Sequence, residues 1–138
     1  MEIIIHDSIK LCEIQKEFSK HFPYLKLEFF GFQPEQKMVF TRENLITDTT
    51  QTLGDVRHLH RIGHISINGH LKVNTLEQNF QENYGINVQV FRKSANTWLL
   101  TTTTDNWTLV EQNKKGEEMN NAVKAEATDN YDEIHEQL

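Results

Sequence analysis

The chain has 138 residues, 37% of them hydrophobic, a formal net charge of −6, a single cysteine and no run of eighteen apolar residues. This composition excludes a membrane-spanning helix and an intrachain disulfide framework, and the length fits one ordinary domain or two very small ones. Because Cys12 stands alone and residues 1–10 lack the basic stretch and apolar core of a signal peptide, we expect a cytoplasmic protein.

The first predicted unit opens with a short apolar strand over residues 2–6. A helix begins near Cys12 and ends at Pro23, which cannot continue the helical hydrogen-bond ladder. Its apolar face repeats every fourth residue, at Ile14, Phe18 and Phe22. Residues 24–30 then alternate in polarity, which predicts a strand whose core-facing residues are Leu25, Leu27 and Phe29.

The connection to the second unit is predicted to be mostly irregular. Residues 31–36 contain a glycine and a proline and indicate a turn. We expect a return strand over 38–41, a polar loop over 44–52, and a short helical turn over 52–56 that places Leu53 and Val56 on the core.

The second predicted unit repeats the first one sixty-two residues later, with Val73–Phe91 matching Leu11–Phe30. A strand over 64–67 leads into Asn68-Gly69, a dipeptide that favours a type I′ turn and therefore a tight hairpin. Asn74 is expected to cap the next helix in a capping box with Glu77. The helix carries the same apolar stripe and ends at a glycine; these residues are Leu76, Phe80, Tyr84 and Gly85. Strands over 86–90 and 98–104 follow.

The acidity of the chain belongs to its C-terminal tail. Residues 111–138 hold eight acids and three lysines, whereas residues 1–110 hold twelve acids and eleven lysines and arginines. Neither part offers the basic face that a nucleic-acid-binding protein normally presents, so nucleic acid is not the expected partner.

These elements predict an α+β fold, built as a tandem repeat of two small β-grasp-like units (strand-helix-strand-strand) packed together. The expected boundaries are 1–57 for the first repeat, 58–63 for a linker, 64–115 for the second repeat, and 116–138 for an acidic tail that is helical or disordered. The order of elements is also compatible with other small α+β sandwiches. Burial is marginal in a unit of fewer than about 60 residues, so the two units should share a core or a sheet edge.

Two groups of side chains were candidates for metal binding or catalysis. His58, His60 and His64 could ligate zinc if they converged, but no cysteine or carboxylate completes a known closed spacing, and we expect no metal and no cofactor. Cys12 lies near a helix N-terminus, where a thiolate is favoured. Its counterpart in the second unit is Asn74, so we expect Cys12 to fill a cap position and to have no catalytic role.

The far end of the second unit has no counterpart in the first. It holds five candidate partner-binding residues, which are Phe91, Arg92, Lys93, Trp98 and Trp107. Tryptophan and arginine are the residues most enriched at binding hot spots. Phe91 should point away from the core, Trp98 should be a core residue, and Trp107 should be the more exposed tryptophan.

The stretches 22–30, 52–57 and above all 86–113 are similar to a group of small bacterial proteins. That group shares the pattern Phe-Gly-Leu-x-Val-Gln-Val-Phe-Arg-Lys-Ser, then Trp-Leu, then Thr-Asp-x-Trp-Thr-Leu. The resemblance covers most of residues 8–115, with Tyr84-Gly85-Ile86 as a conservative departure. It implies a shared fold and carries over no activity and no catalytic residue.

The sequence therefore predicts a non-enzymatic protein–protein interaction or adaptor module in the cytoplasm. Exposed sheet edges would also allow homodimerisation or strand addition. One alternative is a small metal-dependent or cysteine-dependent enzyme using the histidines or Cys12. A further alternative is a nucleic-acid-binding accessory protein using Arg57, Arg61, Arg92 and Lys93.

Overall fold

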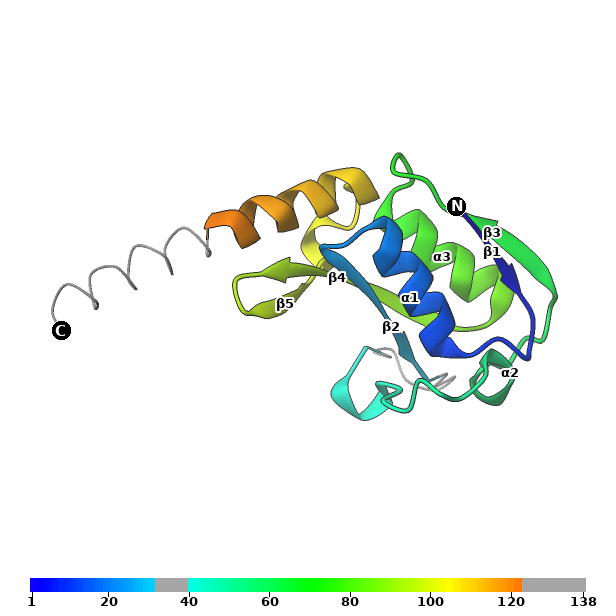
Figure 1. Cartoon of the computed structure of the whole chain (residues 1–138). Coiled ribbons are helices and arrows are strands. Elements are labelled where there is room, and N and C mark those ends of the chain that lie inside the picture. The colour runs from blue at the N-terminus through cyan, green and yellow to red at the C-terminus, as the bar shows by residue number, and fades with distance from the viewer. Residues whose placement is uncertain (32–39, 123–138) are drawn as a thin grey trace, which may run out of the picture.

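Two helices cover one face of a three-stranded antiparallel sheet in the computed structural model, which describes residues 1–31 and 40–122 (Figure 1). The helices are α1 (Leu11–His21) and α3 (Val73–Tyr84), and the sheet has the strand order β2-β4-β5. A separate two-stranded sheet of β1 and β3 lies beside the helices. The remaining elements are β1 (Glu2–Ile5), β2 (Leu25–Phe30), η1 (Arg42–Asn44), α2 (Leu53–Val56), β3 (Gly63–Ser66), β4 (Asn87–Ser94), β5 (Thr97–Leu100), the 3₁₀ turn η2 (Thr102–Thr104) and a C-terminal helix described over 109–122. The predicted mixture of helices and strands is confirmed.

Strands of the first half of the chain pair with strands of the second half. β1 and β3 are antiparallel, with Glu2 opposite Ser66, and β2 and β4 are antiparallel, with Leu25 opposite Arg92. The amine of Met1 also donates a hydrogen bond to the Ile67 carbonyl at 2.8 Å. β4 and β5 form a hairpin within the second half. The two halves therefore share both sheets.

The predicted apolar faces of the helices form the core. Ile14 and Phe18 of α1 and Leu76 and Phe80 of α3 are fully buried. The Phe80 ring meets the Phe29 ring of β2 edge to face, with 6.4 Å between ring centres. Each such side chain contributes about 1.5–3 kcal/mol by leaving water, so these apolar stripes dominate the stability of the fold.

The predicted C-terminal end of α3 is confirmed, whereas its predicted N-terminal cap is wrong. Gly85 adopts the left-handed conformation, with φ 68°, as expected for the C-cap. The capping box of Asn74 and Glu77 is wrong, because α3 begins earlier, with Lys72 at the N-cap and no side-chain cap. The Asn74 N–H instead donates to the Asp105 carbonyl at 2.7 Å, so the backbone of a distant turn satisfies it.

The predicted cap role of Cys12 is wrong for the same reason. Lys10 is the N-cap of α1, and the Cys12 N–H donates to the Thr49 carbonyl at 2.9 Å. The predicted tight hairpin at Asn68-Gly69 is also wrong. Gly69 does not have the positive φ that a type I′ turn requires. The chain after Gly69 leads into α3 at Val73 and does not form the second strand of a hairpin.

Equivalent hydrogen bonds recur in the two halves. The Leu53 N–H donates to the Ile9 carbonyl, and the Leu109 N–H donates to the Leu71 carbonyl. Two reciprocal side-chain caps also correspond, and they join Thr52 to Asp55 and Thr108 to Glu111. The predicted helical turn at 52–56 is confirmed as α2, with Leu53 buried and Val56 packed against the core.

The two return strands were predicted less well. Residues 38 and 39 lie outside the described part of the chain, and Phe40 and Thr41 are not in a strand. The strand expected over 98–104 is β5, which ends at Leu100 and gives way to η2. This early end leaves part of β4 without a strand neighbour on that side.

Replacing Ala95 with glycine should raise the free energy of unfolding by about 0.5–1 kcal/mol. Ala95 lies in the β4–β5 turn at φ 54°, a left-handed conformation that costs a residue with a Cβ about 1–2 kcal/mol and that glycine adopts freely. Urea unfolding monitored by fluorescence measures the change. Ser94→Gly, at a strand position without a positive φ, is the matched control and should be destabilising; a gain in both variants would contradict the argument.

Candidate functional site

The face of the β2-β4-β5 sheet that points away from α1 and α3 carries aromatic and charged side chains. Side chains alternate along a strand, and directly opposed residues of neighbouring strands share a face. The core residues Leu27 and Val90 therefore mark the helix side, and their neighbours along each strand mark the other side. We call this other side the open face; its residues are Lys26, Glu28, Phe30, Asn87, Gln89, Phe91, Lys93, Trp98 and Leu100.

Two lysines of the open face lie against aromatic rings. Lys26 Nζ is 5.5 Å from the centre of the Phe91 ring and 5.0 Å from that of Trp98. Lys93 Nζ is 5.3 Å from the Trp98 ring. A cation within about 6 Å of a ring face gains roughly 0.5–1 kcal/mol at an exposed site. The four side chains thus form a cluster that is partly organised before any partner arrives.

A groove of about 310 Å³ runs beside this cluster. Phe91 and Leu100 of the sheet form one wall, and residues 40–45 form the other. The Phe40 ring stands edge to face on Phe30, with 5.3 Å between ring centres. The charged side chains that line the groove are Lys26, Arg42 and Glu28, so the groove has one more positive than negative charge.

The structure divides the five predicted partner-binding residues between the two faces of the sheet. Phe91, Lys93 and Trp98 belong to the open face, and Phe91 points away from the core as expected. Trp98 is half-buried and is not a core residue, so that expectation is wrong. Arg92 and Trp107 lie on the helix side, where the Arg92 guanidinium is 5.7 Å from the Trp107 ring.

Arg92 links β4 to the C-terminal helix by a hydrogen bond. The side chain is only 9% exposed, and its Nη1 donates to Gln112 Oε1 at 2.9 Å. Gln112 in turn donates to the carbonyl of Thr104 at 2.8 Å. Because the guanidinium is engaged inside the molecule, we assign Arg92 a structural role and exclude it from the open face.

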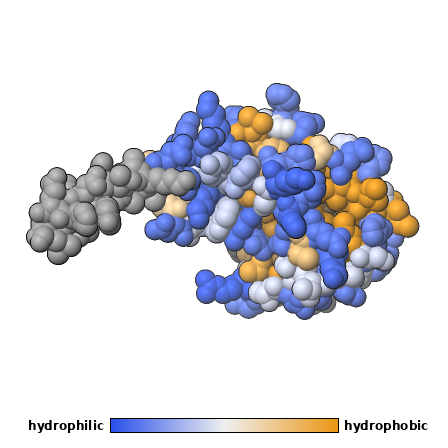
Figure 2. Space-filling view, viewed as in Figure 1, coloured by the Kyte–Doolittle hydropathy of each residue, from blue (hydrophilic) through white to orange (hydrophobic). Residues whose placement is uncertain are grey.

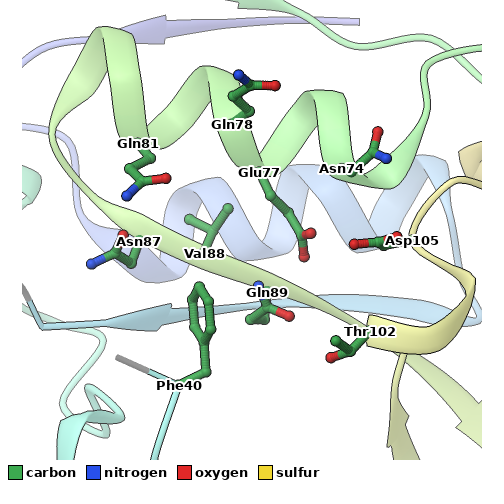
Figure 3. A pocket seen from close by; sticks show the side chains of 10 residues that line it. All are labelled: Phe40, Asn74, Glu77, Gln78, Gln81, Asn87, Val88, Gln89, Thr102 and Asp105. Carbon is green, nitrogen blue, oxygen red and sulfur yellow. The ribbon is translucent and has the colours of Figure 1, made fainter. Parts of the chain in front are cut away.

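A second hollow, of about 270 Å³, lies where β4 continues past the end of β5 (Figure 3). We call it the edge cavity. Glu77 reaches into it from α3 and accepts a hydrogen bond from the Val90 N–H at 3.2 Å. Thr101 Oγ1 donates to the carbonyl of the same residue, Val90, at 2.8 Å, so both backbone groups of Val90 are paired at the free edge of β4. Asp105 enters from the turn that follows η2 (Figure 3).

The Glu77 carboxyl has the most perturbed acidity among the described residues. Burial raises its pKa to about 7, the Val90 N–H opposes this change, and the negative charge of Asp105 adds to it. Glu77 was not predicted as a site residue, because it was assigned to the cap of the helix. Its position in the helix does indicate partial burial: it lies four residues after Val73 and three before Phe80, and so it borders the buried apolar face of α3.

The three candidate histidines do not converge. His60 Nδ1 lies 2.9 Å from an Asp7 carboxylate oxygen, and His64 Nε2 lies 3.9 Å from Glu2. Within residues 1–31 and 40–122 there is no group of three or more His, Cys, Asp or Glu side chains that could hold a metal ion. A hydrogen bond from Arg57, and to a smaller extent one from His60, lowers the pKa of Asp7 below its ordinary value. Asp7 therefore forms an ion pair with the buried Arg57 side chain, beside α2.

Apolar side chains also gather on the surface over β1 and β3 (Figure 2). Ile4 is 66% exposed and Ile62 is 75% exposed. Ile4 projects from β1, and Ile62 lies just before β3. Ile4 also lines a hollow of about 300 Å³, whose described lining residues include acidic side chains but no lysine, arginine, phenylalanine or tryptophan. The open face, which combines aromatic rings, cations and a groove, is the better candidate site.

No protein-family model, curated protein or solved structure that was compared with the chain matches it. Every helix in the described ranges is too short or too polar to cross a bilayer. The geometry of the open face and of the edge cavity is therefore the basis for inferring a function.

Proposed function

We propose that the protein is a non-enzymatic interaction module whose open face binds an acidic protein segment with an aromatic or large apolar anchor. The observation that carries the proposal is the cluster of Lys26, Phe91, Lys93 and Trp98, in which both lysines are already held against rings. Side chains that are ordered before binding lose less conformational entropy on binding, and aromatic anchors supply most of the energy at hot spots.

Charge supports an acidic partner. The cluster and its groove contain Lys26, Arg42 and Lys93 against the single carboxylate of Glu28, which Lys26 contacts at 3.2 Å. The groove between the sheet and residues 40–45 is lined by Phe30, Phe40 and Leu100, which offer apolar surface to an anchor residue. Complementary charge of this kind raises association rates and selects among partners.

A single-stranded nucleic acid would also stack on aromatic rings, and it is the rival partner. Affinity for nucleic acid comes mainly from neutralising many phosphates, whereas this face offers three cations on a chain of net charge −6. A protein segment needs only one or two carboxylates beside its anchor. This comparison favours protein over nucleic acid.

We further propose that residues 1–57 and 64–115 are copies of one β-grasp-like unit, and that the chain belongs with the bacterial group it resembles. The recurring hydrogen bonds and reciprocal caps support the duplication. Homologous sequences whose two halves align with each other would strengthen it, and homologous sequences whose two halves do not align would argue against it. A cytoplasmic location, proposed from the free Cys12, can be checked by cell fractionation.

Reversing the charge of the open face should weaken binding of acidic peptides at least tenfold. Peptides selected from a random display library on the native protein should pair Asp or Glu with Trp, Phe or Leu. Fluorescence anisotropy would then compare the native protein with the double variant Lys26→Glu/Lys93→Glu. Charge reversal turns attraction into repulsion and removes all three lysine–ring contacts.

The matched control is Lys114→Glu/Lys115→Glu, which makes the same change of charge on the exposed side of the C-terminal helix. It should leave peptide affinity within about twofold. Selected peptides without an acidic bias, or equal losses in the two double variants, would overturn the proposal. Tighter binding to oligothymidylate than to every selected peptide would favour the nucleic-acid alternative.

A further inference from the structure

We propose that the edge cavity binds an organic cation, a primary ammonium or a guanidinium group, between the carboxylates of Glu77 and Asp105. This site adjoins the open face, because Gln89 belongs to both and Phe40 lines both hollows, but it does not depend on whether the open face binds a protein. Three features of the cavity point to a cation: its charge, its largely buried amide side chains, and its size and walls.

Two carboxylates face the same cavity without a cation. Glu77 and Asp105 both line it, and the described residues provide neither carboxylate with an ion-pair partner. Burial is the main cause of the raised pKa of Glu77, and the like charge of Asp105 adds to it. A bound cation would remove that repulsion.

Buried amide side chains add unused hydrogen-bonding groups. Asn87 is 4% exposed and Gln89 is 6% exposed, and both line the cavity from β4 (Figure 3). No side-chain hydrogen bond joins either amide to another described residue, and neither is among the fully buried side-chain atoms that lack a partner, so both amides are open to the cavity. An amide oxygen is an acceptor for the N–H groups of an ammonium or guanidinium ion. Gln81 reaches toward the same space from α3 (Figure 3).

The volume and the apolar walls favour an organic cation over a metal ion. A cavity of about 270 Å³ would hold roughly nine water molecules at ~30 Å³ each. That space greatly exceeds a bare metal ion and suits a ligand of several heavy atoms. Phe40 and Val88 also line it, so the alkyl chain of an organic cation would pack against apolar surface.

Titration with n-butylguanidinium, followed by ¹⁵N-edited NMR, tests the site directly. At pH 8 the amide signal of Val90 and the side-chain amide signals of Asn87 and Gln89 should shift saturably, with a millimolar dissociation constant as befits a ligand of this size. The uncharged isostere n-butylurea should cause no saturable shift. Equal binding of the two compounds, or no localised shift with either, would overturn the proposal.

Variants separate the site from a general effect on folding. Glu77→Gln keeps an acceptor for the Val90 N–H but loses the charge, and it should weaken n-butylguanidinium binding at least tenfold. Glu82→Gln changes an exposed carboxylate on the same helix and should bind as the native protein does. A similar loss in both variants would contradict the assignment, as would saturable binding of calcium chloride that displaces n-butylguanidinium.

The pH dependence provides a second readout. The cation binds the ionised form of Glu77, whose pKa is about 7, so affinity should be about tenfold weaker at pH 6 than at pH 8. Asp105 is the other ionisable side chain among the described residues that line the cavity. Glu77→Gln should abolish the difference, and a pH-independent affinity in the native protein would contradict the role of Glu77.

Discussion

Replacing Gly85 with alanine is expected to lower the free energy of unfolding by about 3 kcal/mol. Gly85 closes α3 at φ 68°, and a Cβ on a left-handed residue costs about 1–2 kcal/mol. An ideal Cβ at this position would also lie 2.6 Å from the backbone nitrogen of Leu59. That nitrogen belongs to the backbone and cannot rotate away, so the close contact adds to the conformational cost.

Chemical unfolding in urea would measure the loss, and two further variants separate its causes. Gly31→Ala is the matched control, because Gly31 has no positive φ and its added Cβ would meet the nearest atom at an ordinary 3.7 Å. It should change stability by less than about 1 kcal/mol. Gly85→Asn tolerates the left-handed conformation but keeps the contact with Leu59, so it should fall between the two. Equal losses at positions 31 and 85 would refute this account of α3.

Replacing Glu77 with glutamine is expected to stabilise the protein by about 2–3 kcal/mol at pH 8. Burial raises the pKa of Glu77 from 4.5 to about 7, so the folded state prefers the protonated carboxyl. The stability that this preference contributes is fully present below pH 4.5 and is lost as the pH rises through 7. The glutamine side chain stays neutral throughout, so it avoids the loss.

Unfolding free energies of the native protein and of Glu77→Gln, measured between pH 4 and pH 8, test this prediction. The difference between the two proteins should be small at pH 4 and grow toward pH 8. Subtracting one protein from the other removes the contribution of Asp7 and Glu111, whose lowered pKa values act only in the acid range. Glu82→Gln should show no such trend, and a difference that does not change with pH would refute the raised pKa.

The helices were predictable because their apolar residues repeat with the helical period. The stripes of α1 and α3 and the stop at Gly85 needed only local rules. Strand pairing was not predictable in this way, because alternation shows which residues face the core but does not show which strand lies alongside. The predicted capping box is absent, because the Asn74 N–H donates to the carbonyl of Asp105, a residue of a turn distant in sequence that no local rule could identify.

The candidate site was partly accessible from the same alternation. If Val90 faces the core, Phe91 faces away and Arg92 faces inward, which separates two residues that sequence proximity had grouped together. The cluster with Lys26 required knowledge that β2 and β4 are neighbours. The edge cavity was inaccessible, since it depends on the early end of β5 and on the approach of Asp105 to α3.

The pairing of strands across the two halves has a consequence during synthesis on the ribosome. Glu2 pairs with Ser66, sixty-four residues later, and β2 awaits β4 for a similar length of chain. At a translation rate of roughly 5–20 residues per second, the first half emerges about 3–13 seconds before its partner strands. During that interval the backbone groups at the edges of β1 and β2 have no partner strand, and the apolar face of α1 is not covered by the complete sheet. Neither sheet can therefore be completed until the second half has been made.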